Sequence, residues 1–339
     1  MKRLLYEIKD YLELILSLIY SYKHRYIPNT FQSKFYISNY HKVSNPKTKK
    51  CIIFMIDGKI YHGVLTDRLK GLLSTYYIAR SNNYDFYVYW NSPFRLDTFL
   101  VPNSAIDYRI NADEISYGVS SFPALSNLLP KKYKLKNTLR KWTYINLLRI
   151  NNKYMQIHCY TNHDFAYNHF PLLYKELFKP SPLLQRELNK HLSIIGKSYY
   201  SYSFRFTNLL GDFPDIVGTP LSVEEKNSLI KKNIEELKVL LKRLPVGFKA
   251  FVTSDSAYFL RCVKSIDDRI YVVTGNISHI ANDIGNGNDM QSWLKIFVDQ
   301  HIIMNAKKVF LLKTGAMYNS GFPKFAALIG GAPYKIHQF

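Results

Sequence analysis

Arg205 is the residue whose type and position say most about chemistry. It lies near the end of a short apolar stretch, residues 199–206, and a loop follows that reaches Gly211 and Asp212. We interpret the stretch as a strand, which places the arginine at a carboxyl end, where open α/β sheets bind ligands. A guanidinium holds two phosphate oxygens at once and keeps its charge near neutral pH, which suits a pyrophosphate leaving group. On this segment alone, an arginine in a surface salt bridge is the alternative.

The loop after the first predicted strand carries a second group of candidate residues. Gly63 allows close backbone approach, and the N–H groups at the start of the following helix attract anions. Asp67 and Arg68 lie at that helix start and would approach a phosphate or a sugar. His62 is the candidate general base, with Asp57 and Asp67 as alternatives, although a loop histidine is more often a surface residue. The loop is neither a Walker loop nor a G-x-G-x-x-G fingerprint.

Two further loops place hydroxyl groups and a carboxylate at helix starts. Ser254 and Asp255 follow a predicted strand, and the aspartate can accept hydrogen bonds from the N–H edge of a guanine or from ribose. Ser320, Gly321 and Phe322 begin the last predicted helix, where hydroxyl and backbone donors can hold a β-phosphate while the phenylalanine packs beneath. Helix capping is the alternative for both loops, because Ser, Thr and Asp commonly fill that role.

Strands and helices alternate along the chain and would position these loops. Short apolar runs predict strands, and apolar residues at helical spacing predict helices. A capping box, Ser222 with Glu225, starts the longest helix. The alternation predicts an α/β fold with parallel, doubly wound sheets. The predicted strands are 51–56, 86–90, 199–206, 249–253, 269–273 and 307–313, and the predicted helices begin near 67 and cover 222–244, 257–264, 292–305 and a short stretch after 321.

The chain of 339 residues is too long for one core, so we expect two domains. We place an N-terminal extension at 1–49, a first domain at 50–190 and a second domain at 191–339. The apolar run at 11–20 is interrupted on its approach by acidic residues, and it is shorter than the ~20 residues that a membrane span needs. We expect an amphipathic helix there, either packed on the domain or lying on a membrane face.

The net charge of +21, from 46 basic and 25 acidic residues, favours anionic partners such as nucleotide-sugars, phospholipid surfaces, lipid pyrophosphates or nucleic acid. Biased nucleotide usage in the genome can produce the same excess. Between Glu114 and Asp164 there are basic residues but no acidic ones, which is either a basic helix facing an anionic acceptor or membrane, or an ordinary solvated face. The three isolated cysteines indicate neither a disulfide framework nor a zinc site and fit a reducing cytoplasm.

Taken in order, these loops resemble the fucosyltransferase superfamily, which includes bacterial α-1,2-fucosyltransferases, nodulation fucosyltransferases and protein O-fucosyltransferases. The typical Gly-Gly-x-Gly-Asn-x-Leu loop is matched by residues 63–69, and the Thr-Asp element by residues 254–255. The typical terminal Ser-x-Phe is matched by residues 320–322, downstream of a helix that bears Asp299. The resemblance covers about residues 50–335.

The strand end around Arg205 also matches, with departures. The family's His-x-Arg-x-Gly-Asp is matched by residues 203–205, with residues 211–212 displaced by an insertion. Ser203 stands where the family has histidine, and Asp67 stands where it has asparagine. These departures affect the expected identity of the transferred sugar more than the expected fold or the expected nucleotide, GDP.

The resemblance implies a GT-B architecture, in which two Rossmann-like, doubly wound domains face each other across a cleft. The first domain would be the acceptor side, and the second would bind the GDP-sugar. It also implies an inverting transfer from GDP-fucose without a metal or a cofactor. We assign stabilisation of the departing pyrophosphate to Arg205, helped by Ser320 and by N–H groups near Phe322, and we include Asp212 among the donor-binding residues.

We expect the acceptor to be a glycan in cell-surface polysaccharide biosynthesis, carried on a lipid pyrophosphate, because the N-terminal segment and the basic stretch suit a membrane face. The location would be cytoplasmic and peripheral on the inner face of the cell membrane, with no nucleic-acid partner. Two alternatives stay open. One is a transferase that uses another GDP-sugar, and the other is a non-enzymatic basic protein that binds an anionic membrane or nucleic acid.

Overall fold

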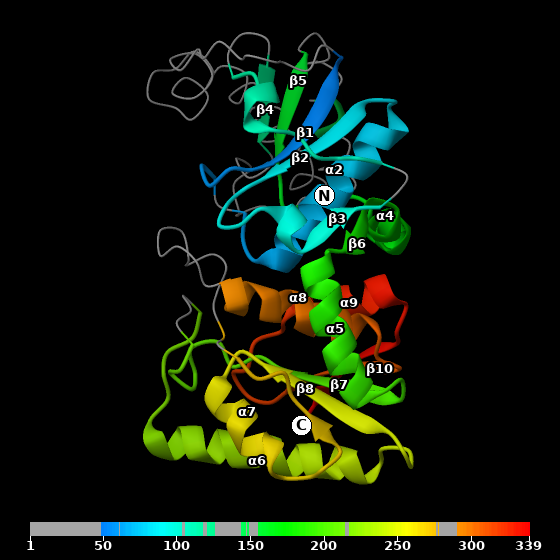
Figure 1. Cartoon of the computed structure of the whole chain (residues 1–339). Coiled ribbons are helices and arrows are strands. Elements are labelled where there is room, and N and C mark those ends of the chain that lie inside the picture. The colour runs from blue at the N-terminus through cyan, green and yellow to red at the C-terminus, as the bar shows by residue number, and fades with distance from the viewer. Residues whose placement is uncertain are drawn as a thin grey trace, which may run out of the picture. The chain divides into compact units, whose positions relative to one another are not determined.

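The chain forms two compact units. The first comprises Met1–Leu96 and Pro102–Phe178, and the second comprises Asp97–Val101 and Lys179–Phe339 (Figure 1). The extension predicted at 1–49, apart from Lys49, lies outside the described residues, and so do the basic residues between Glu114 and Asp164. The computed structural model describes residues 49–60, 62–103, 106–117, 121–125, 144–146, 148, 155–213, 217–275, 277 and 290–339.

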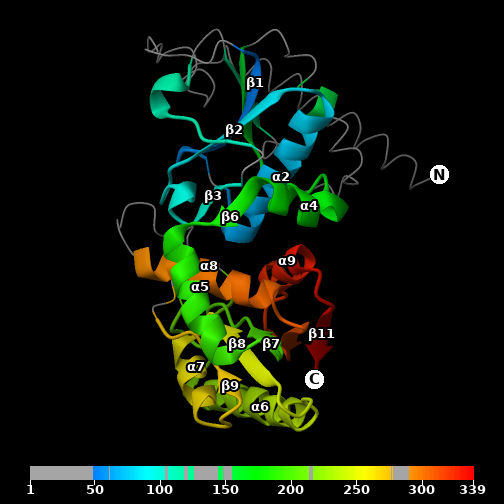
Figure 2. The same ribbon diagram turned by 45° about the vertical axis from the view of Figure 1, so that its right-hand side comes forward.

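Within the described residues, the first unit is built on a parallel sheet. Its strands are β1 (Cys51–Ile56), β2 (Asp85–Trp90), β4 (Ser121–Leu125) and β5 (Gln156–Tyr160), and its helices are α2 (Leu65–Ser81) and α4 (Phe170–Leu177). The strand order is β2-β1-β5-β4. All six residues of β1 are buried, as expected for a continuous apolar strand that is covered on both faces. Helix α2 packs beside β1 and β2, and α4 packs on α2 (Figure 2).

Short elements complete the chain around the division between the units. The strands β3 (Leu100–Pro102) and β6 (Phe178–Pro180) pair with each other. The 3-10 helices are η2 (Leu96–Thr98), η3 (Ala112–Glu114) and η4 (Tyr167–His169).

Helix α2 lies very close to the chain that follows β5 at Gly71. A Cβ added there would lie 2.0 Å from the carbonyl oxygen of Thr161 and 3.0 Å from Cα of Asn162. A Gly to Ala change inside a helix normally stabilises it by about 1 kcal/mol. We expect Gly71→Ala instead to lower the free energy of unfolding by about 1–3 kcal/mol, because the backbone must move apart. Urea unfolding followed by circular dichroism measures the difference, and a more stable variant would contradict the close approach.

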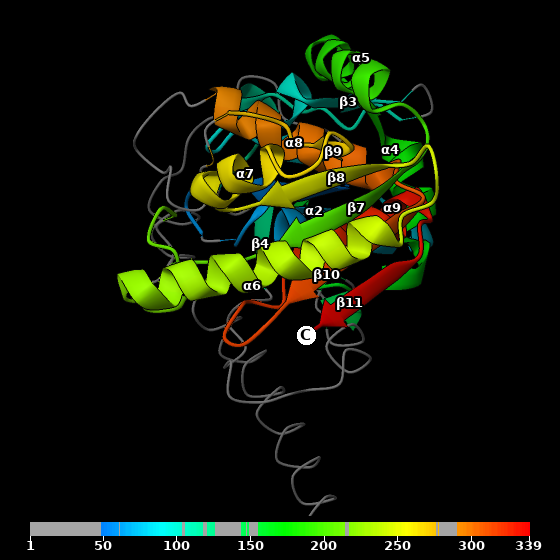
Figure 3. The same cartoon turned by 90° about the horizontal axis from the view of Figure 1, so that it is seen from below.

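The second unit is built on a parallel sheet with the order β11-β10-β7-β8-β9. The strands are β7 (Tyr199–Phe204), β8 (Lys249–Ser254), β9 (Ile270–Tyr271), β10 (Lys308–Lys313) and β11 (Tyr334–Gln338). The helices are α5 (Pro182–Ile195), α6 (Val223–Lys242), α7 (Ala257–Lys264), α8 (Met290–Met304) and α9 (Gly321–Gly330). Helices α6 and α7 cover one face of the sheet, and α8 and α9 cover the other (Figure 3). The strand order reverses at β7, so this sheet is doubly wound.

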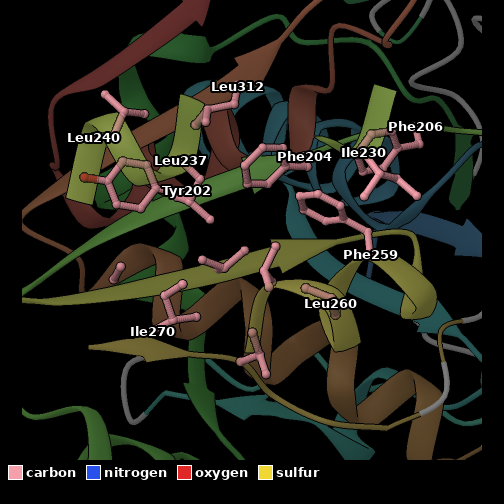
Figure 4. Close-up of a cluster of buried hydrophobic side chains, with 14 of the residues drawn as sticks. Tyr202, Phe204, Phe206, Ile230, Leu237, Leu240, Phe259, Leu260, Ile270 and Leu312 are labelled. Atoms are coloured by element: carbon pink, nitrogen blue, oxygen red, sulfur yellow. The ribbon is translucent and has the colours of Figure 1, made fainter. Parts of the chain in front are cut away.

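A buried hydrophobic cluster joins α6 and α7 to their face of this sheet (Figure 4). Tyr202 and Phe204 of β7 meet the apolar stripe of α6, which includes Ile230 and Leu237. That stripe repeats at helical spacing, and its burial against the sheet is what stabilises so long a helix. The cluster fixes the position of β7, the strand that carries Arg205 at its end.

The α/β fold with doubly wound parallel sheets, predicted from the sequence, is confirmed. The capping box is also confirmed, because Ser222 Oγ accepts the N–H of Glu225 at 3.2 Å and the Glu225 carboxylate accepts the N–H of Ser222 at 2.9 Å. The strand predicted at 269–273 is shorter than expected, since only Ile270–Tyr271 pairs with β8.

Candidate functional site

Arg205 lies at the switch point of the second sheet, where the strand order reverses at β7. It follows β7 directly, and in register Phe204 pairs with Ser254 on one side and with Leu312 on the other. The loops after three parallel strands therefore meet around this arginine. Such a switch point, at the carboxyl edge of the strands, is where doubly wound sheets bind ligands. The predicted position of Arg205 at a carboxyl strand end is confirmed.

The residues on either side of Arg205 fix the direction of its side chain. Phe204 and Phe206 are buried, and both contact Phe259 of α7, with ring centroids at 4.7 and 4.9 Å (Figure 4). Side chains of consecutive residues in an extended chain point to opposite faces. Arg205 therefore points away from the hydrophobic cluster.

Arg205 contacts residues of the loops on either side of it. Its Nε lies 3.3 Å from Oδ2 of Asp255, and its guanidinium carbon lies 4.7 Å from the centroid of the Phe213 ring. Its carbonyl oxygen accepts a hydrogen bond from the N–H of Tyr318 at 3.0 Å, which ties the loop after β7 to the loop that leads into α9. The side chain is 21% exposed, so the cation is held in place and is still accessible to solvent.

The carboxylate of Asp255 is turned into the protein. Its side chain is 3% exposed. Oδ1 accepts the N–H of Phe206 at 2.9 Å, and Oδ2 accepts the N–H of Thr207 at 2.6 Å. Burial raises the pKa of Asp255, and the charge of Arg205 and the two N–H groups oppose that rise. Binding of guanine or ribose by this residue stays a prediction, but both of its oxygens already have partners within the chain.

Asp212, which the sequence analysis assigns to binding of the GDP-sugar, accepts hydrogen bonds at the start of α7. Its Oδ2 accepts the O–H of Ser256 at 2.8 Å and the N–H of Tyr258 at 2.9 Å. Gly211 before it is exposed and has φ of 76°, a left-handed value that glycine adopts without strain. The displaced Gly-Asp pair therefore lies beside the loop of Asp255, joined to it by hydrogen bonds.

The two hydroxyl groups predicted to bind the donor are engaged within the protein. Ser254 Oγ lies 3.4 Å from Oδ1 of Asp255. Ser320 Oγ accepts the N–H of Phe322 at 3.3 Å and so caps α9, the alternative that the sequence left open. Gly321 and Phe322 are half-buried at that helix start. Donor binding by these residues stays a prediction.

Sequence reasoning missed a buried ion pair on α8 close to the end of β8. Lys295 Nζ lies 2.6 Å from Oδ2 of Asp299, and the same oxygen accepts the O–H of Thr253 at 3.2 Å. Both charged side chains are buried. The signal was the spacing, because Lys and Asp four residues apart share one face of a helix. Asp299 was used only as a landmark for the terminal motif, and Lys295 was not singled out.

His62 lies in the first unit and is buried, so the alternative of a surface histidine is wrong. Its ring stacks on Tyr160, with centroids 5.9 Å apart, and meets Phe54 edge-on at 6.1 Å. Burial and the charge of Arg68 lower its pKa to about 4, against the opposing effects of Asp57 and the Thr161 backbone. The imidazole is therefore neutral near pH 7, but it is enclosed. Its role as general base stays a prediction.

The low pKa of His62 makes stability depend on pH. The pKa falls from an ordinary 6.5 to about 4 on folding, so the unfolded chain binds more protons than the folded chain between these values. Stability therefore falls as pH is lowered through this window, and we expect His62 alone to cost about 2 kcal/mol at pH 5 relative to pH 7.5. Urea unfolding of the wild type and His62→Gln at both pH values measures this cost. An equal pH dependence in the two proteins would contradict it.

Arg68 holds the loop that precedes α2. Its Nε donates to the carbonyl oxygen of Gly63 at 3.0 Å, and its Nη1 donates to that of Ser92 at 2.9 Å. Gly63 has φ of 76°, and a Cβ there would lie 2.8 Å from Oδ2 of Asp67. Asp67 also lies 3.6 Å from Lys70 Nζ. The structure brings these three predicted residues together at the start of α2, where Arg68 is buried.

A polar cluster surrounds Asp57 at the end of β1. Its Oδ2 accepts hydrogen bonds from Tyr160 O–H at 2.9 Å, Tyr117 O–H at 3.3 Å and Lys59 Nζ at 3.0 Å. Burial and the charge of Asp57 raise the pKa of Tyr117, so this phenol stays protonated and donates a hydrogen bond to Asp57. Asp57 is therefore anchored by several donors, and one of them, Tyr160, stacks on the ring of His62.

Solved structures share this arrangement of elements. NodZ α-1,6-fucosyltransferase soaked with GDP-fucose superposes with a TM-score of 0.55 at 14% identity, covering 86% of this chain and 95% of that one. Fucosyltransferase NodZ from Bradyrhizobium gives 0.54 at 15% identity, covering 86% and 96%. The chain therefore shares the fold of these NodZ structures. The resemblance drawn from the motifs is thus confirmed for the fold.

A second kind of fucosyltransferase structure is less similar to this chain, and searches by sequence find no relative. POFUT1 in complex with GDP-fucose gives a lower TM-score of 0.45 at 10% identity, covering 86% of this chain and 98% of that one. No protein-family model matches the sequence, and no curated protein matches it.

On this fucosyltransferase fold, the predicted site residues form two groups, one in each unit. The first unit holds His62, Gly63, Asp67 and Arg68, and the second unit holds Arg205, Asp212, Ser254, Asp255, Ser320, Gly321 and Phe322. Among the residues that the structure describes, no cluster of His, Cys, Asp and Glu is arranged to hold a metal ion. In the same residues, no helix has the length and apolar character needed to cross a membrane.

Proposed function

We propose that the chain is a fucosyltransferase that moves fucose from GDP-fucose to a hydroxyl group of a glycan. The observation that supports this most is Arg205, a half-buried guanidinium fixed at the switch point of the second sheet. It has this position in a fold shared with NodZ, whose crystal was soaked with GDP-fucose. A guanidinium there suits a nucleoside diphosphate better than an uncharged ligand.

The chemistry is a single displacement with inversion. The acceptor oxygen attacks the anomeric carbon, the bond from that carbon to the β-phosphate oxygen breaks, and GDP leaves with the electron pair. Negative charge builds on the pyrophosphate as this bond breaks. A fixed donor aimed at such developing charge contributes roughly 3–4 kcal/mol. We assign this contribution to Arg205, so that the reaction requires no metal.

Two buried oxygens of the second unit would receive hydrogen bonds from the nucleoside. Oδ1 of Asp299 and Oγ of Ser203 are buried and make no hydrogen bond within the described residues. A buried polar atom without a partner costs about 1–3 kcal/mol. N–H and O–H groups of a bound nucleoside would remove that cost. In this proposal Asp299 accepts the hydrogen bond from the nucleoside that the sequence analysis had assigned to Asp255.

The acceptor side belongs to the first unit in this proposal. His62 is the base that takes the acceptor proton, with Asp57 and Asp67 as the alternatives. The glycan is one of cell-surface polysaccharide biosynthesis, carried on a lipid pyrophosphate at the inner face of the cell membrane. The net charge of +21 supports an anionic acceptor or surface.

A second GDP-sugar is the competing donor. Ser203 stands two residues before Arg205, at the position where the fucosyltransferase superfamily has histidine. The surroundings of the leaving group therefore differ from the family's pattern. Assays with GDP-fucose and GDP-mannose in parallel decide between the two sugars. Faster turnover of GDP-mannose would replace fucose in the proposal and leave the GDP intact.

The nucleotide is tested most directly by thermal shift. We expect GDP at 100 times its Kd to add about 2.7 kcal/mol of stability, and we expect UDP and CDP to leave the melting temperature unchanged. A shift with UDP or CDP in place of GDP would contradict the donor. Salt-sensitive binding to DNA without any response to GDP would instead favour a non-enzymatic basic protein.

A further inference from the structure

Two loops meet at Arg205, the first residue of one of them, and the first contact between these loops runs through Asp255. We call residues 205–213, after β7, loop A, and residues 255–258, which follow β8 and include the first two residues of α7, loop B. The carboxylate of Asp255 in loop B accepts the N–H groups of Phe206 and Thr207 in loop A, at 2.9 and 2.6 Å. One buried side chain thus fixes the backbone that directly follows Arg205.

A second contact runs in the opposite direction. Asp212 of loop A accepts the O–H of Ser256 and the N–H of Tyr258 in loop B, at 2.8 and 2.9 Å. Each loop therefore supplies one aspartate that binds donors of the other loop. We call these contacts the reciprocal clamp.

The backbone of loop A forms an anion-binding concavity that the protein fills itself. Successive N–H groups that point the same way, next to a residue in the left-handed region, bind phosphate in many proteins. Thr207 has φ of 54°, and its N–H and that of Phe206 converge on the Asp255 carboxylate. While Asp255 occupies this concavity, a ligand phosphate cannot use these donors. On this side of the site, the side chain of Arg205 is then the group that meets the negative charge of a ligand.

The conformation of Thr207 shows that the clamp determines the path of loop A. A β-branched residue rarely adopts a positive φ, and it persists there only where surrounding contacts impose it. The N–H of Thr207 is held by Asp255, and its hydroxyl donates to the carbonyl oxygen of Phe206. Arg205, two residues earlier, is aimed by the same contacts.

We infer that Asp255 and Asp212 are positioning residues, which serve transfer only by holding Arg205 and do not contact the nucleotide. The inference rests on the proposed function, because it takes Arg205 as the group that stabilises the leaving GDP. Asp255 acts on the guanidinium through Nε at 3.3 Å and on the backbone through loop A. Asp212 acts by keeping loop A against loop B.

A double-mutant cycle tests this assignment. Asp255→Asn should lower kcat roughly 100-fold, because an amide cannot accept both N–H groups and carries no charge for Arg205. KM for GDP-fucose should stay within about threefold of the wild type, since the lost interaction matters in the transition state. The double variant Asp255→Asn with Arg205→Ala should be no slower than Arg205→Ala alone, because one residue acts through the other.

The opposite result has a distinct signature. If the two substitutions multiply in their effects on kcat, Asp255 acts independently of Arg205 and the inference is wrong. It is also wrong if Asp255→Asn weakens binding of guanosine, which has no phosphate for Arg205 to meet.

Matched variants separate positioning from general damage. Asp267→Asn makes the same change in another Asp–Arg pair of the second unit, where Asp267 Oδ2 lies 2.7 Å from Arg269 Nη2, and should keep the wild-type kcat. If Asp255→Asn does not fold, Asp212→Asn carries the test, because it leaves the contact between Arg205 and Asp255 unchanged. It should again be non-additive with Arg205→Ala, and additivity would overturn the inference.

Amide exchange separates failure of the clamp from failure of the proposed function. If the wild type neither binds GDP nor transfers fucose, the proposed function fails, and the clamp can still be measured. The amides of Phe206 and Thr207 should exchange roughly tenfold faster in Asp255→Asn than in the wild type, because their acceptor is weakened. Equal exchange rates in the two proteins would overturn the clamp itself.

Discussion

Replacing Arg205 by alanine is expected to lower kcat for fucose transfer by at least ~10²-fold, the effect of removing one fixed donor from a developing negative charge. The fold should survive, because the side chain is 21% exposed and lies outside the hydrophobic cluster of the second unit. Initial-rate kinetics with GDP-fucose measure the loss, and circular dichroism verifies the fold. EDTA should leave the wild-type rate unchanged, since in the proposed mechanism the guanidinium takes the role that a metal ion would have.

Two further variants sharpen this prediction. Arg205→Lys keeps a charge but not the planar pair of donors, so its rate should lie between those of the wild type and Arg205→Ala. Arg269→Ala removes another aspartate-paired arginine of the second unit and should keep the wild-type rate. Normal turnover in Arg205→Ala would remove the proposed mechanism, and so would a nucleotide that binds far from this residue.

The position of Arg205 could be predicted because the signals for it are local. Residues 199–206 form a short apolar run, and the following loop carries glycine and aspartate. Such a pattern predicts a strand and its carboxyl end without knowledge of any distant residue. The capping box at Ser222 was predictable for the same reason, because both of its partners lie within one helical turn.

The roles of Asp255 and Asp212 could not be predicted in the same way. Asp255 binds N–H groups that lie 48 and 49 residues earlier in the chain, and Asp212 binds groups 44 and 46 residues later. A sequence shows that an aspartate follows a strand, but not which backbone donors the folded sheet brings to it. Both residues therefore suggested ligand binding, while the structure gives each of them partners in the neighbouring loop.

Strand β5 shows why buried polar strands escape sequence reasoning. Its sequence includes Gln156 and His158, which would ordinarily indicate an exposed segment, yet all of its residues are buried. Gln156 Oε1 lies 3.0 Å from His158 Nε2 and accepts the N–H of Ser116, while its Nε2 donates to the carbonyl oxygen of Glu114. Polar side chains can be buried when their hydrogen bonds are made within the protein, and two of these partners, Ser116 and Glu114, come from a distant loop.

The buried pair on α8 leads to the largest expected change in stability. Lys295→Met should lower the free energy of unfolding by about 3–5 kcal/mol, because the carboxylate of Asp299 would remain buried without its cation. Methionine preserves most of the apolar stem, so the loss reports the charge more than the packing. Chemical denaturation of the wild type and the variant measures the difference.

A matched pair of variants decides whether the charge is responsible. Lys238→Met breaks a Lys–Glu pair on α6 in which both side chains are exposed, and it should cost less than about 1 kcal/mol because solvent screens such pairs. Adding Asp299→Asn to Lys295→Met should restore part of the lost stability, since the unpaired charge is removed while Thr253 keeps an acceptor. If the double variant is less stable than Lys295→Met, the cost lies in packing, and Asp299 is not a buried charge that depends on Lys295.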